Sequence, residues 1–407
     1  MIPLPMLRQL TRLYPRLVMA TTSGGYEGTG QGFMLRFIAA LDAQKLMRLS
    51  LDKPVRWCQG DQLEAWLDRT LMLKADKLDS PPAMEAGACE MQLLKNPGDP
   101  DNFLQLRQVY ALLNTAHYRT RPSDLRMMME NPDLLLLVAC QQDVVVGAAL
   151  LNIEGGLDDN LCAEIFLGRR RPRGHLLAQM LTAQAGLENF AGHRGIRVQR
   201  IAVAETHRRH GIGTRLLEYA LRYGQENSMD YLGASFALDP ETLCFWRQAR
   251  FSLVHVSYAQ GKSSGDQSIV VLRSITAEID VEIDLLQQRI QRQLPIWMTQ
   301  FLQNMSADQV SSLLRFAGFD TSIDDHEQLE VEAFARGHRG FEHCFASLQK
   351  FVMRCVAQSS SVPDSLLIEK AIQNRDWDLL ERESGSEGRK TLQQRLRGQV
   401  DALLKGC

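Results

Sequence analysis

One segment in the middle of the chain restricts its fold more than any other. Residues 200–203 are typical of a strand end, residues 208–214 of a short basic loop with two glycines, and residues 215–220 of an amphipathic helix. Small residues at such a turn let several backbone N–H groups point at one place, where the helix N-terminus adds partial positive charge. The segment therefore predicts an α/β fold with a pyrophosphate-binding loop, although a plain helix start with a glycine-containing loop would look similar.

Two other phosphate-binding motifs fit the chain less well. A dinucleotide-binding loop would have a third glycine where Leu216 stands. A P-loop would have the full pattern Gly-x-x-x-x-Gly-Lys-Ser/Thr. Residues 261–263 read Gly-Lys-Ser, but Val256 occupies the position of the first glycine, so the full pattern is absent from the sequence.

Length and composition limit which class of protein this chain can be. A chain of 407 residues suggests two to three domains, and a net charge of −2 excludes a uniformly basic nucleic-acid binder. The eight cysteines include no Cys-x-x-Cys pair, so neither a zinc site nor a disulfide framework is expected. We expect a cytoplasmic protein, because the N-terminus does not resemble a signal peptide and no apolar run is long enough to span a membrane.

The chain divides into three blocks, expected as domains at 1–86, 87–275 and 276–407, with a linker at 79–88. In the first block, a strand at 16–22, a glycine-rich loop, a helix at 33–41 and a strand at 45–51 indicate an incomplete α/β unit. The second block has an expected helix at 103–116 and a hairpin of strands at 134–140 and 144–152. Further expected elements there are strands at 196–203, 231–237, 251–257 and 268–273 and a helix at 241–248. The third block is expected to be helical at 278–293, 307–317, 331–335, 343–356, 366–374 and 391–404.

The strand before the basic loop has an irregular pattern. Its apolar residues stand at Ile196 and Val198, and then at Ile201 and Val203. A regular strand keeps a period of two, so this slip by one residue predicts a β-bulge.

Several segments together resemble one family, the bacterial tRNA(Met) cytidine acetyltransferases, which are relatives of the eukaryotic RNA cytidine acetyltransferases. The basic loop itself resembles the acetyl-CoA loop of the GNAT acetyltransferases. The other segments are Gly-Tyr-Glu-Gly-Thr-Gly-Gln-Gly-Phe at 25–33, Pro-Val-Arg-Trp at 54–57, Ala-His-Tyr-Arg-Thr at 116–120 and Arg-Arg-Arg-Pro-Arg-Gly at 169–174.

The resemblance implies a fold and a reaction. The fold would be a partial RecA-like helicase/ATPase module, then a GNAT domain with a mixed sheet and flanking helices, then an α-helical tRNA-binding tail. The reaction would transfer acetyl from acetyl-CoA to N4 of the wobble cytidine in elongator tRNA(Met), with ATP and Mg²⁺ used by the ATPase module. The family's P-loop and its acidic Mg²⁺-binding motif would precede residue 1, so we expect a C-terminal portion that hydrolyses no ATP unless a separate chain supplies the P-loop half.

The resemblance also implies coenzyme-binding residues. Ile201, Ala202 and Val203 would lie along the acetyl-pantetheine arm, where a backbone N–H can stabilise an oxyanion. The pyrophosphate would lie against Arg208, Arg209, His210, Gly211, Ile212, Gly213 and Thr214.

Further coenzyme contacts are expected in the helix at 241–248. Glu241 matches a coenzyme-contacting position of the family, or it is simply a helix-start carboxylate. Gln248 stands where the family has a coenzyme-contacting arginine, and Arg247 or Arg250 could substitute for it. Trp246 stands where many GNAT enzymes have a tyrosine acid, and Arg250 stands where a glycine is expected.

Four residues are candidates for the remaining chemistry. Arg56 matches the family's ATP-contacting arginine, or it is a structural or surface residue. His117 and Tyr118 could move the proton of the cytidine amine, or they are packed residues at a helix end. Glu164 is a further candidate base.

Local basic clusters are the expected RNA contacts. One cluster comprises Arg169, Arg170, Arg171 and Arg173, and the tail adds Arg336, Arg339, Arg389 and Lys390. Phe334 and Phe341 flank one tail segment, as core residues or as stacking partners of a base.

Two other functions stay open at this point. The chain could be a GNAT enzyme that acetylates a protein or a small-molecule amine. It could also be a non-catalytic tRNA-binding remnant, because the P-loop is missing and Trp246, Gln248 and Arg250 depart from the family pattern.

Overall fold

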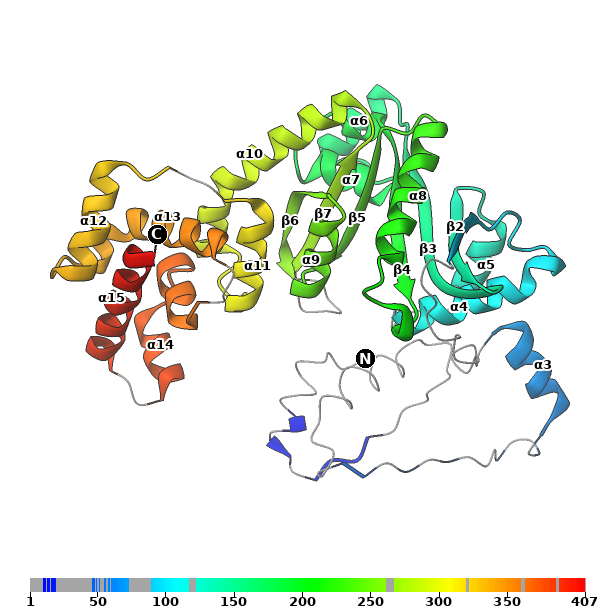
Figure 1. The fold of residues 1–407 in the computed structure, drawn as a ribbon, viewed down its shortest axis with the longest axis horizontal. Coiled ribbons are helices and arrows are strands. Elements are labelled where there is room, and N and C mark those ends of the chain that lie inside the picture. The colour runs from blue at the N-terminus through cyan, green and yellow to red at the C-terminus, as the bar shows by residue number, and fades with distance from the viewer. Residues whose placement is uncertain are drawn as a thin grey trace. The chain divides into compact units, whose positions relative to one another are not determined.

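The computed structural model describes most of the chain from Cys89 onward and selected positions before it (Figure 1). The described residues are 10–11, 13–14, 16–19, 46–47, 49, 51, 55, 58, 60–72, 89–116, 122–260, 267–319, 322–359, 363–385 and 388–406. The chain divides into two compact units. The first unit is Met1–Ala234 with Lys262–Gly265, and the second is Ser235–Gly261 with Asp266–Cys407.

The first expected block lies mostly outside the described residues. Its one fully described element is helix α3, Gln62–Thr70, whose N-terminus is capped by Asp61. The Asp61 carboxylate accepts a hydrogen bond from the backbone N–H of Glu64 over 2.9 Å. The helix expected at 33–41 lies outside the described residues and stays a prediction. The described positions of the strands expected at 16–22 and 45–51 are 16–19, 46, 47, 49 and 51, and none of them is in a strand.

A seven-stranded mixed sheet runs through the middle of the chain in the order β1-β2-β3-β4-β5-β7-β6. Strands β4 and β5 pair in parallel, whereas β1–β2, β2–β3, β3–β4 and β6–β7 pair antiparallel. This sheet confirms the expected fold class. The strands are β1 Glu90–Leu93, β2 Leu134–Gln141, β3 Val144–Gly155, β4 Arg194–Val203, β5 Tyr231–Ala237, β6 Ser252–Gln260 and β7 Gln267–Ser274.

The expected hairpin and the expected bulge are both present. Strands β2 and β3 are joined by Gln142 and Asp143, which both have positive φ, as a two-residue turn requires. On β4, Arg200 pairs with Leu150 and Val198 pairs with Leu151, so Gln199 is the extra residue. The bulge lets Ala202 reach the core although the apolar pattern of β4 changes phase.

Five helices of the first unit belong to this sheet region. They are α4 Phe103–Ala116, α5 Pro122–Glu130, α6 Asp159–Phe166, α7 Leu176–Ala183 and α8 Ile212–Glu226. Helix α4 packs on the face that contains Ala148 and Leu150. Helix α8 packs on the opposite face. The close approach is seen at Gly147, where an added Cβ would lie 2.8 Å from the side chain of Ile212. Helix α4 has the bounds that the sequence predicts.

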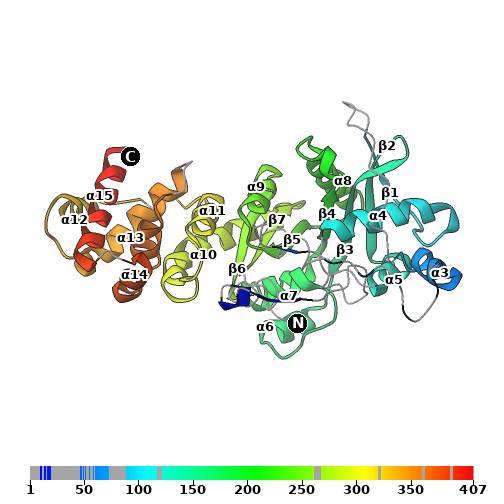
Figure 2. The ribbon, with the colours of Figure 1, turned by 90° about the horizontal axis from the view of Figure 1, so that it is seen from below.

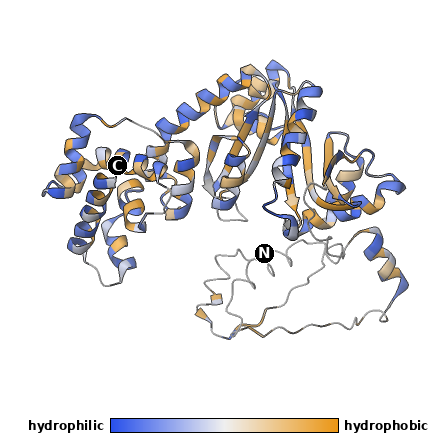
Figure 3. Cartoon of the chain, viewed as in Figure 1, coloured by the Kyte–Doolittle hydropathy of each residue, from blue (hydrophilic) through white to orange (hydrophobic). Residues whose placement is uncertain are grey.

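The second unit contains helix α9, Pro240–Gln248, and a helical tail. The tail helices are α10 Ala277–Gln300, α11 Ala307–Ala317, α12 Asp325–Arg336, α13 Phe341–Gln358, the π-helix η7 Leu367–Ile372, α14 Trp377–Ser384 and α15 Arg389–Gly406. Both views show α12 to α15 gathered together (Figures 1 and 2). Figure 3 shows mostly hydrophobic residues on the strands and a mixture of both kinds on helices such as α15.

Two tail predictions were wrong at one end. The helix expected from residue 331 begins earlier, at Asp325, where Asp324 and Glu327 form a capping box. The sequence predicts that the first tail helix stops at residue 293, before Pro295, but α10 continues to Gln300. A proline inside a helix removes one backbone hydrogen bond. Here the turn that follows is held by the burial of Leu294, Trp297 and Met298, so tertiary packing outweighs the proline.

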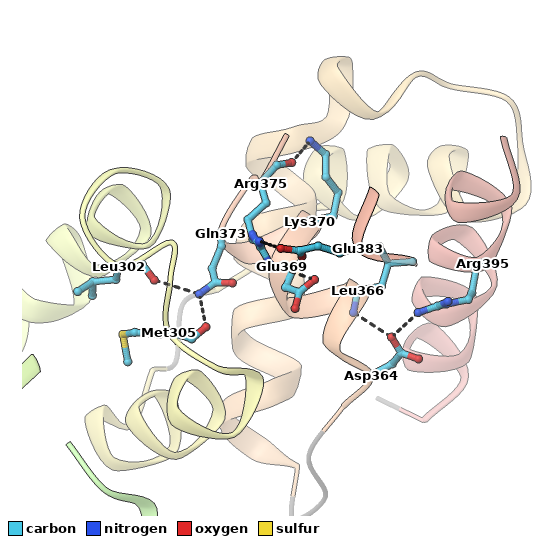
Figure 4. A network of polar contacts seen from close by, with 10 residues as sticks. All are labelled: Leu302, Met305, Asp364, Leu366, Glu369, Lys370, Gln373, Arg375, Glu383 and Arg395. Atoms are coloured by element: carbon cyan, nitrogen blue, oxygen red, sulfur yellow. Dashed lines mark hydrogen bonds and ion pairs between the residues drawn. The ribbon is translucent and has the colours of Figure 1, made fainter. Parts of the chain in front are cut away.

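A polar network holds the π-helix in the tail (Figure 4). The buried Gln373 side chain donates to the carbonyls of Leu302 and Met305 over 3.0 and 2.9 Å. Lys370 lies over the rings of Phe341 and Trp377, and burial lowers the pKa of its ammonium group. Within the part of the chain that the structure describes, no helix is long and apolar enough to cross a membrane.

Candidate functional site

The end of β4 offers backbone groups to a ligand. Its pairing with β5 covers only four residues and ends where Val198 meets Ala234. Beyond that point, Ile201, Ala202 and Val203 pair with β3 on the other side. An antiparallel strand points alternate N–H and C=O groups to its two edges. The edge that β5 leaves therefore carries polar backbone groups that suit an amide-rich ligand.

The loop after β4 is anchored by a buried histidine. His207 is fully buried, and its ring nitrogens lie 2.9 Å from Thr206 Oγ1 and 3.2 Å from Gln141 Oε1. Burial lowers the pKa of this imidazole, and the nearby His210 lowers it further. A neutral ring therefore ties the start of the loop to strand β2, and the exposed residues 208–211 follow.

The loop then opens helix α8 in a conformation that suits an anion. Arg209 and Gly211 have φ angles of 63° and 76°, and Gly211 is the N-cap of α8. The first helical bond runs from the N–H of Arg215 to the carbonyl of Gly211, over 3.0 Å. The N–H groups of the three preceding residues, 212–214, have no partner within the helix. They form a small donor surface at the positive end of the helix dipole.

Gly211 is needed for its conformation rather than for space. A Cβ placed on it would meet no atom within 4 Å, so the area beside it is open. The next residue, Ile212, is buried and packs above Gly147, where any side chain would collide with it. The helix start is thus packed on β3 through Ile212, while the space beside Gly211 is open.

Arg215 has a structural contact. Its guanidinium donates to the carbonyl of Cys89 over 2.7 Å, which ties α8 to the start of β1. It also lines a cavity of about 400 Å³ together with Tyr219 and Arg222. Within the loop, Arg208 donates to the carbonyl of Val203 over 3.2 Å, so Arg209 is the arginine of the loop that remains exposed without a described partner.

A cluster that sequence reasoning missed lies where α4, α5 and β4 meet. Arg200, just before the last three residues of β4, forms a 2.8 Å ion pair with Asp124, and their side chains are only 12% and 15% exposed. Tyr110 lies in the same cluster and is hydrogen bonded to Asn114. Burial, the largest effect, raises the pKa of the Tyr110 phenol. The only signal in the sequence was an arginine within an apolar strand.

A second missed cluster centres on the buried Glu154. Its carboxylate accepts hydrogen bonds from Arg197 over 2.5 Å and from the backbone N–H of Leu177, in the first turn of α7, over 2.8 Å. The backbone N–H of Gly155 donates to His175 Nδ1 over 2.9 Å. These bonds fix the base of the connection between α6 and α7, which is the segment that carries the arginine cluster.

Comparison with known proteins agrees with this geometry. The family model for the helicase domain of the RNA cytidine acetyltransferase NAT10/TcmA matches residues 1–74, and the model GNAT acetyltransferase 2 matches 108–229 and 219–276. The tRNA(Met) cytidine acetyltransferase TmcA of Nitrosococcus halophilus is 34% identical over 92% of this chain and 52% of its own length. The chain is a relative of the tRNA(Met) cytidine acetyltransferases.

A second relative shows similar coverage. TmcA of Pectobacterium atrosepticum is 36% identical over 86% of this chain and 51% of its own length. The chain therefore spans about half the length of these acetyltransferases. Among solved structures, Ard1 of Thermoplasma volcanium matches 46% of this chain and 99% of its own, with 16% identity and a TM-score of 0.31.

Several positions taken from the acetyltransferase resemblance lie outside the described residues. These are Arg56, His117, Tyr118 and the glycine-rich segment 25–33. The other candidate base, Glu164, is half-buried and forms a 3.0 Å ion pair with Arg169. This pairing makes Glu164 a less available proton acceptor.

The helix expected to contact the coenzyme, α9, has a clear architecture. Glu241 is exposed in its first turn, which is capped by Asp239. Gln248 is exposed near its end and contacts Cys244 Sγ at 3.5 Å. Trp246 is buried against the rings of Phe236, Phe245 and Phe251. The tryptophan is thus a core residue, whereas Glu241 and Gln248 are exposed.

The expected RNA contacts differ in their surroundings. All four arginines of the cluster at 169–173 are exposed, and only Arg169 has an ion-pair partner among the described residues. Lys390 is exposed too. The tail arginines pair with acids: Arg336 with Asp401 at 2.8 Å, Arg339 with Glu330 at 2.7 Å and Arg389 with Glu342 at 3.8 Å. Phe334 and Phe341 are buried, and their rings are in edge-on contact, so they belong to the core.

Proposed function

We propose that this chain transfers the acetyl group of acetyl-CoA to N4 of a cytidine in the anticodon of tRNA(Met), as the names of its relatives suggest. The single observation that supports this best is the open, glycine-capped start of α8 directly after the unpaired edge of β4. The pyrophosphate would lie against residues 208–214, and the acetyl-pantetheine arm would run along Ile201, Ala202 and Val203.

The chemistry needs a base as well as a coenzyme. The lone pair of cytidine N4 is delocalised into the ring, so the nitrogen must lose a proton as it attacks the thioester carbonyl. The C–S bond then breaks, and coenzyme A leaves as the thiolate. We assign the proton transfer to His117 and Tyr118, with a backbone N–H at the end of β4 as the oxyanion donor. Glu241 and Gln248 would complete the coenzyme contacts.

We place the tRNA against Arg169, Arg170, Arg171 and Arg173 and against the tail residues Arg336, Arg339, Arg389 and Lys390. An exposed arginine loop favours RNA over a protein or small-molecule amine, because guanidinium groups bind phosphates well. In this proposal 1–86 is helicase-like, with Arg56 as an ATP contact, 87–275 is the acetyltransferase domain and 276–407 binds tRNA. A tRNA substrate implies a cytoplasmic protein.

The coenzyme assignment is tested with a pair of variants of nearly equal shape. Gly211→Asn and Gly211→Asp both tolerate the positive φ of this position, but only the second adds a negative charge beside the expected pyrophosphate. We expect Gly211→Asp to bind acetyl-CoA at least about tenfold more weakly than Gly211→Asn, a difference of about 1.4 kcal/mol. Isothermal titration calorimetry measures both affinities.

A remote control separates charge at the loop from backbone strain. Gly318 has a φ of 59° at the end of α11 and an equally open Cβ direction. Gly318→Asp should leave acetyl-CoA binding unchanged. Equal affinities of wild type, Gly211→Asn and Gly211→Asp would remove the loop as the coenzyme site, and the acetyl-transfer proposal with it.

A further inference from the structure

The helical tail contains a polar cavity that the proposed coenzyme site does not use. It has a volume of about 630 Å³, within the range of sites that hold small ligands. Its walls come from α10, α12 and α13 and from Phe319 and Ser322, which lie between α11 and α12. The residues that matter here are Gln288, Gln291, Arg292, Glu327, Ala346 and Lys350.

The two long walls of this cavity are fixed relative to each other. Gln288, Gln291 and Arg292 are spaced so that they share one face of α10. The buried side chain of Gln349, on α13, donates to the carbonyl of Pro295 over 3.0 Å and to that of Ile372 over 2.8 Å. This bond holds α10 against α13, so the cavity is part of the folded tail.

The charges in the walls favour an anion. Lys350 Nζ lies 2.7 Å from both carboxylate oxygens of Glu327, so these two charges compensate each other. Glu327 also accepts from the N–H of Asp324 as part of the cap of α12. Arg292 is exposed, and no described carboxylate pairs with it. Two cations and one carboxylate leave one net positive charge.

The amides in the walls favour a ligand with both donors and acceptors. Gln291 Nε2 donates to the carbonyl of Gly318 over 3.3 Å, which leaves its oxygen available as an acceptor. Gln288 is exposed and makes no hydrogen bond with the described residues. Side-chain amides recognise the edges of nucleobases, and guanidinium groups bind phosphates or stack on bases. The amide of Gln288 and the guanidinium of Arg292 lie on one face of α10, one turn apart.

We propose that this cavity accepts one nucleotide of the RNA substrate, with its phosphate at Arg292 and its base edge at Gln288 and Gln291. This inference rests on the proposed function and deepens it. A single-stranded base that leaves its stack can enter such a cavity, whereas a paired base cannot. The cavity would thus contribute to the choice of RNA through an unpaired position.

The test uses the full chain and a fluorescein-labelled tRNA(Met) transcript in fluorescence anisotropy. Ala346→Trp fills the cavity, Arg292→Gln removes its unpaired cation, and Gln288→Leu removes an amide that supports no described contact. Each should weaken tRNA binding by roughly fivefold or more, and Arg292→Gln should also reduce the salt slope by about one ion. Arg289→Gln, on the same helix but outside the cavity, is the matched control and should change affinity less than twofold, by our estimate.

Photo-crosslinking supplies a second measurement. The same transcript with 4-thiouridine should crosslink to tryptic peptides from α10 or α13, and Ala346→Trp should abolish that crosslink. Circular dichroism shows whether Ala346→Trp folds. If it does not fold, the tRNA affinity of Gln288→Leu decides the test. Wild-type affinity in the cavity variants together with no crosslink would overturn the nucleotide site while leaving acetyl transfer to tRNA intact. A wild-type chain that binds acetyl-CoA but no tRNA would overturn both the cavity assignment and the choice of RNA as substrate.

Discussion

Single buried polar residues fix much of the local geometry of this protein. Glu154 joins strand β3, strand β4 through Arg197 and the start of α7. Removing one partner of a buried ion pair typically costs about 3–5 kcal/mol, because the other charge stays buried without compensation. Residues of this kind lie outside the proposed chemistry, yet Glu154 fixes the start of α7, the helix that follows the arginine segment at 169–173.

His255 makes a pH dependence of stability predictable. It is only 3% exposed, and burial lowers its pKa from 6.5 to about 4. The folded state keeps the ring neutral, while the unfolded state binds a proton below pH 6.5. The free energy of unfolding therefore decreases as the pH falls from 6.5 to 4, by about 3 kcal/mol in total. Below pH 4 the ring of His255 is protonated in both states and causes no further loss.

Urea unfolding at a series of pH values measures this effect. His255→Gln should flatten the stability curve between pH 6.5 and 4 relative to wild type. His343→Gln, at an exposed position of α13, should leave the curve unchanged. If wild type and His255→Gln lose stability in parallel over this range, then the ring of His255 is not the responsible group.

At the scale of elements, the ends of the helices show most clearly how local sequence fixes backbone conformation. Helix α8 begins at a glycine with positive φ, and α11 and α12 begin with capping boxes formed by Ser306 and Gln309 and by Asp324 and Glu327. Helix α9 ends differently, because Arg250 has a φ of 61° just after its last turn. This is the position where related acetyltransferases were expected to have glycine.

Arg250→Gly should stabilise the second unit. An L-residue in the left-handed region destabilises the folded state by about 1 kcal/mol, whereas glycine adopts this conformation without that loss. We expect a gain of about 0.5–1 kcal/mol and a melting temperature higher by roughly 2–4 °C in differential scanning calorimetry. Arg247→Gly, within the last turn of α9, should lower it by a similar amount. A lower melting temperature in Arg250→Gly would mean that the arginine side chain makes stabilising contacts.

At the scale of the whole molecule, the distribution of charge matters more than its sum. A net charge of −2 gives no overall attraction to RNA. The loop arginines 170, 171 and 173 are exposed without described acidic partners, whereas three tail arginines are already paired with carboxylates. A paired arginine must give up its partner or share it before it can bind a phosphate.

The two groups of arginines should therefore differ in tRNA binding. The triple change of Arg170, Arg171 and Arg173 to alanine should weaken binding by roughly 1 kcal/mol or more and flatten the dependence on salt. The matched triple change of Arg336, Arg339 and Arg389 should have a smaller effect on both. Filter binding from low to high salt measures the two slopes. Equal losses, or a larger loss in the tail variant, would contradict this ranking.

Sequence alone was enough for the elements whose signal is local. The hairpin of β2 and β3, the bulge at Gln199, the bounds of α4 and α11 and the loop before α8 all follow from the spacing of apolar residues and from glycine. These patterns act over a few residues, so the sequence displays them directly. The helices α3, α5, α6, α7 and α14 were missed. Each has eight or nine residues and shows few repeats of the helical period, although α9, which is equally short, was predicted.

The tertiary structure decided everything that depends on distant partners. Arg200 and Asp124 are 76 positions apart, Arg215 reaches the carbonyl of Cys89 across 126, and Arg336 meets Asp401 across 65. A sequence shows an arginine but not the carboxylate or carbonyl that folding places beside it. Whether a charge is free for a phosphate or already used is therefore settled only by packing, and so is the burial of Phe334 and Phe341. The sequence determined the conformation of the loop at 208–214 because backbone conformation is local, whereas the availability of each side chain depends on the whole fold.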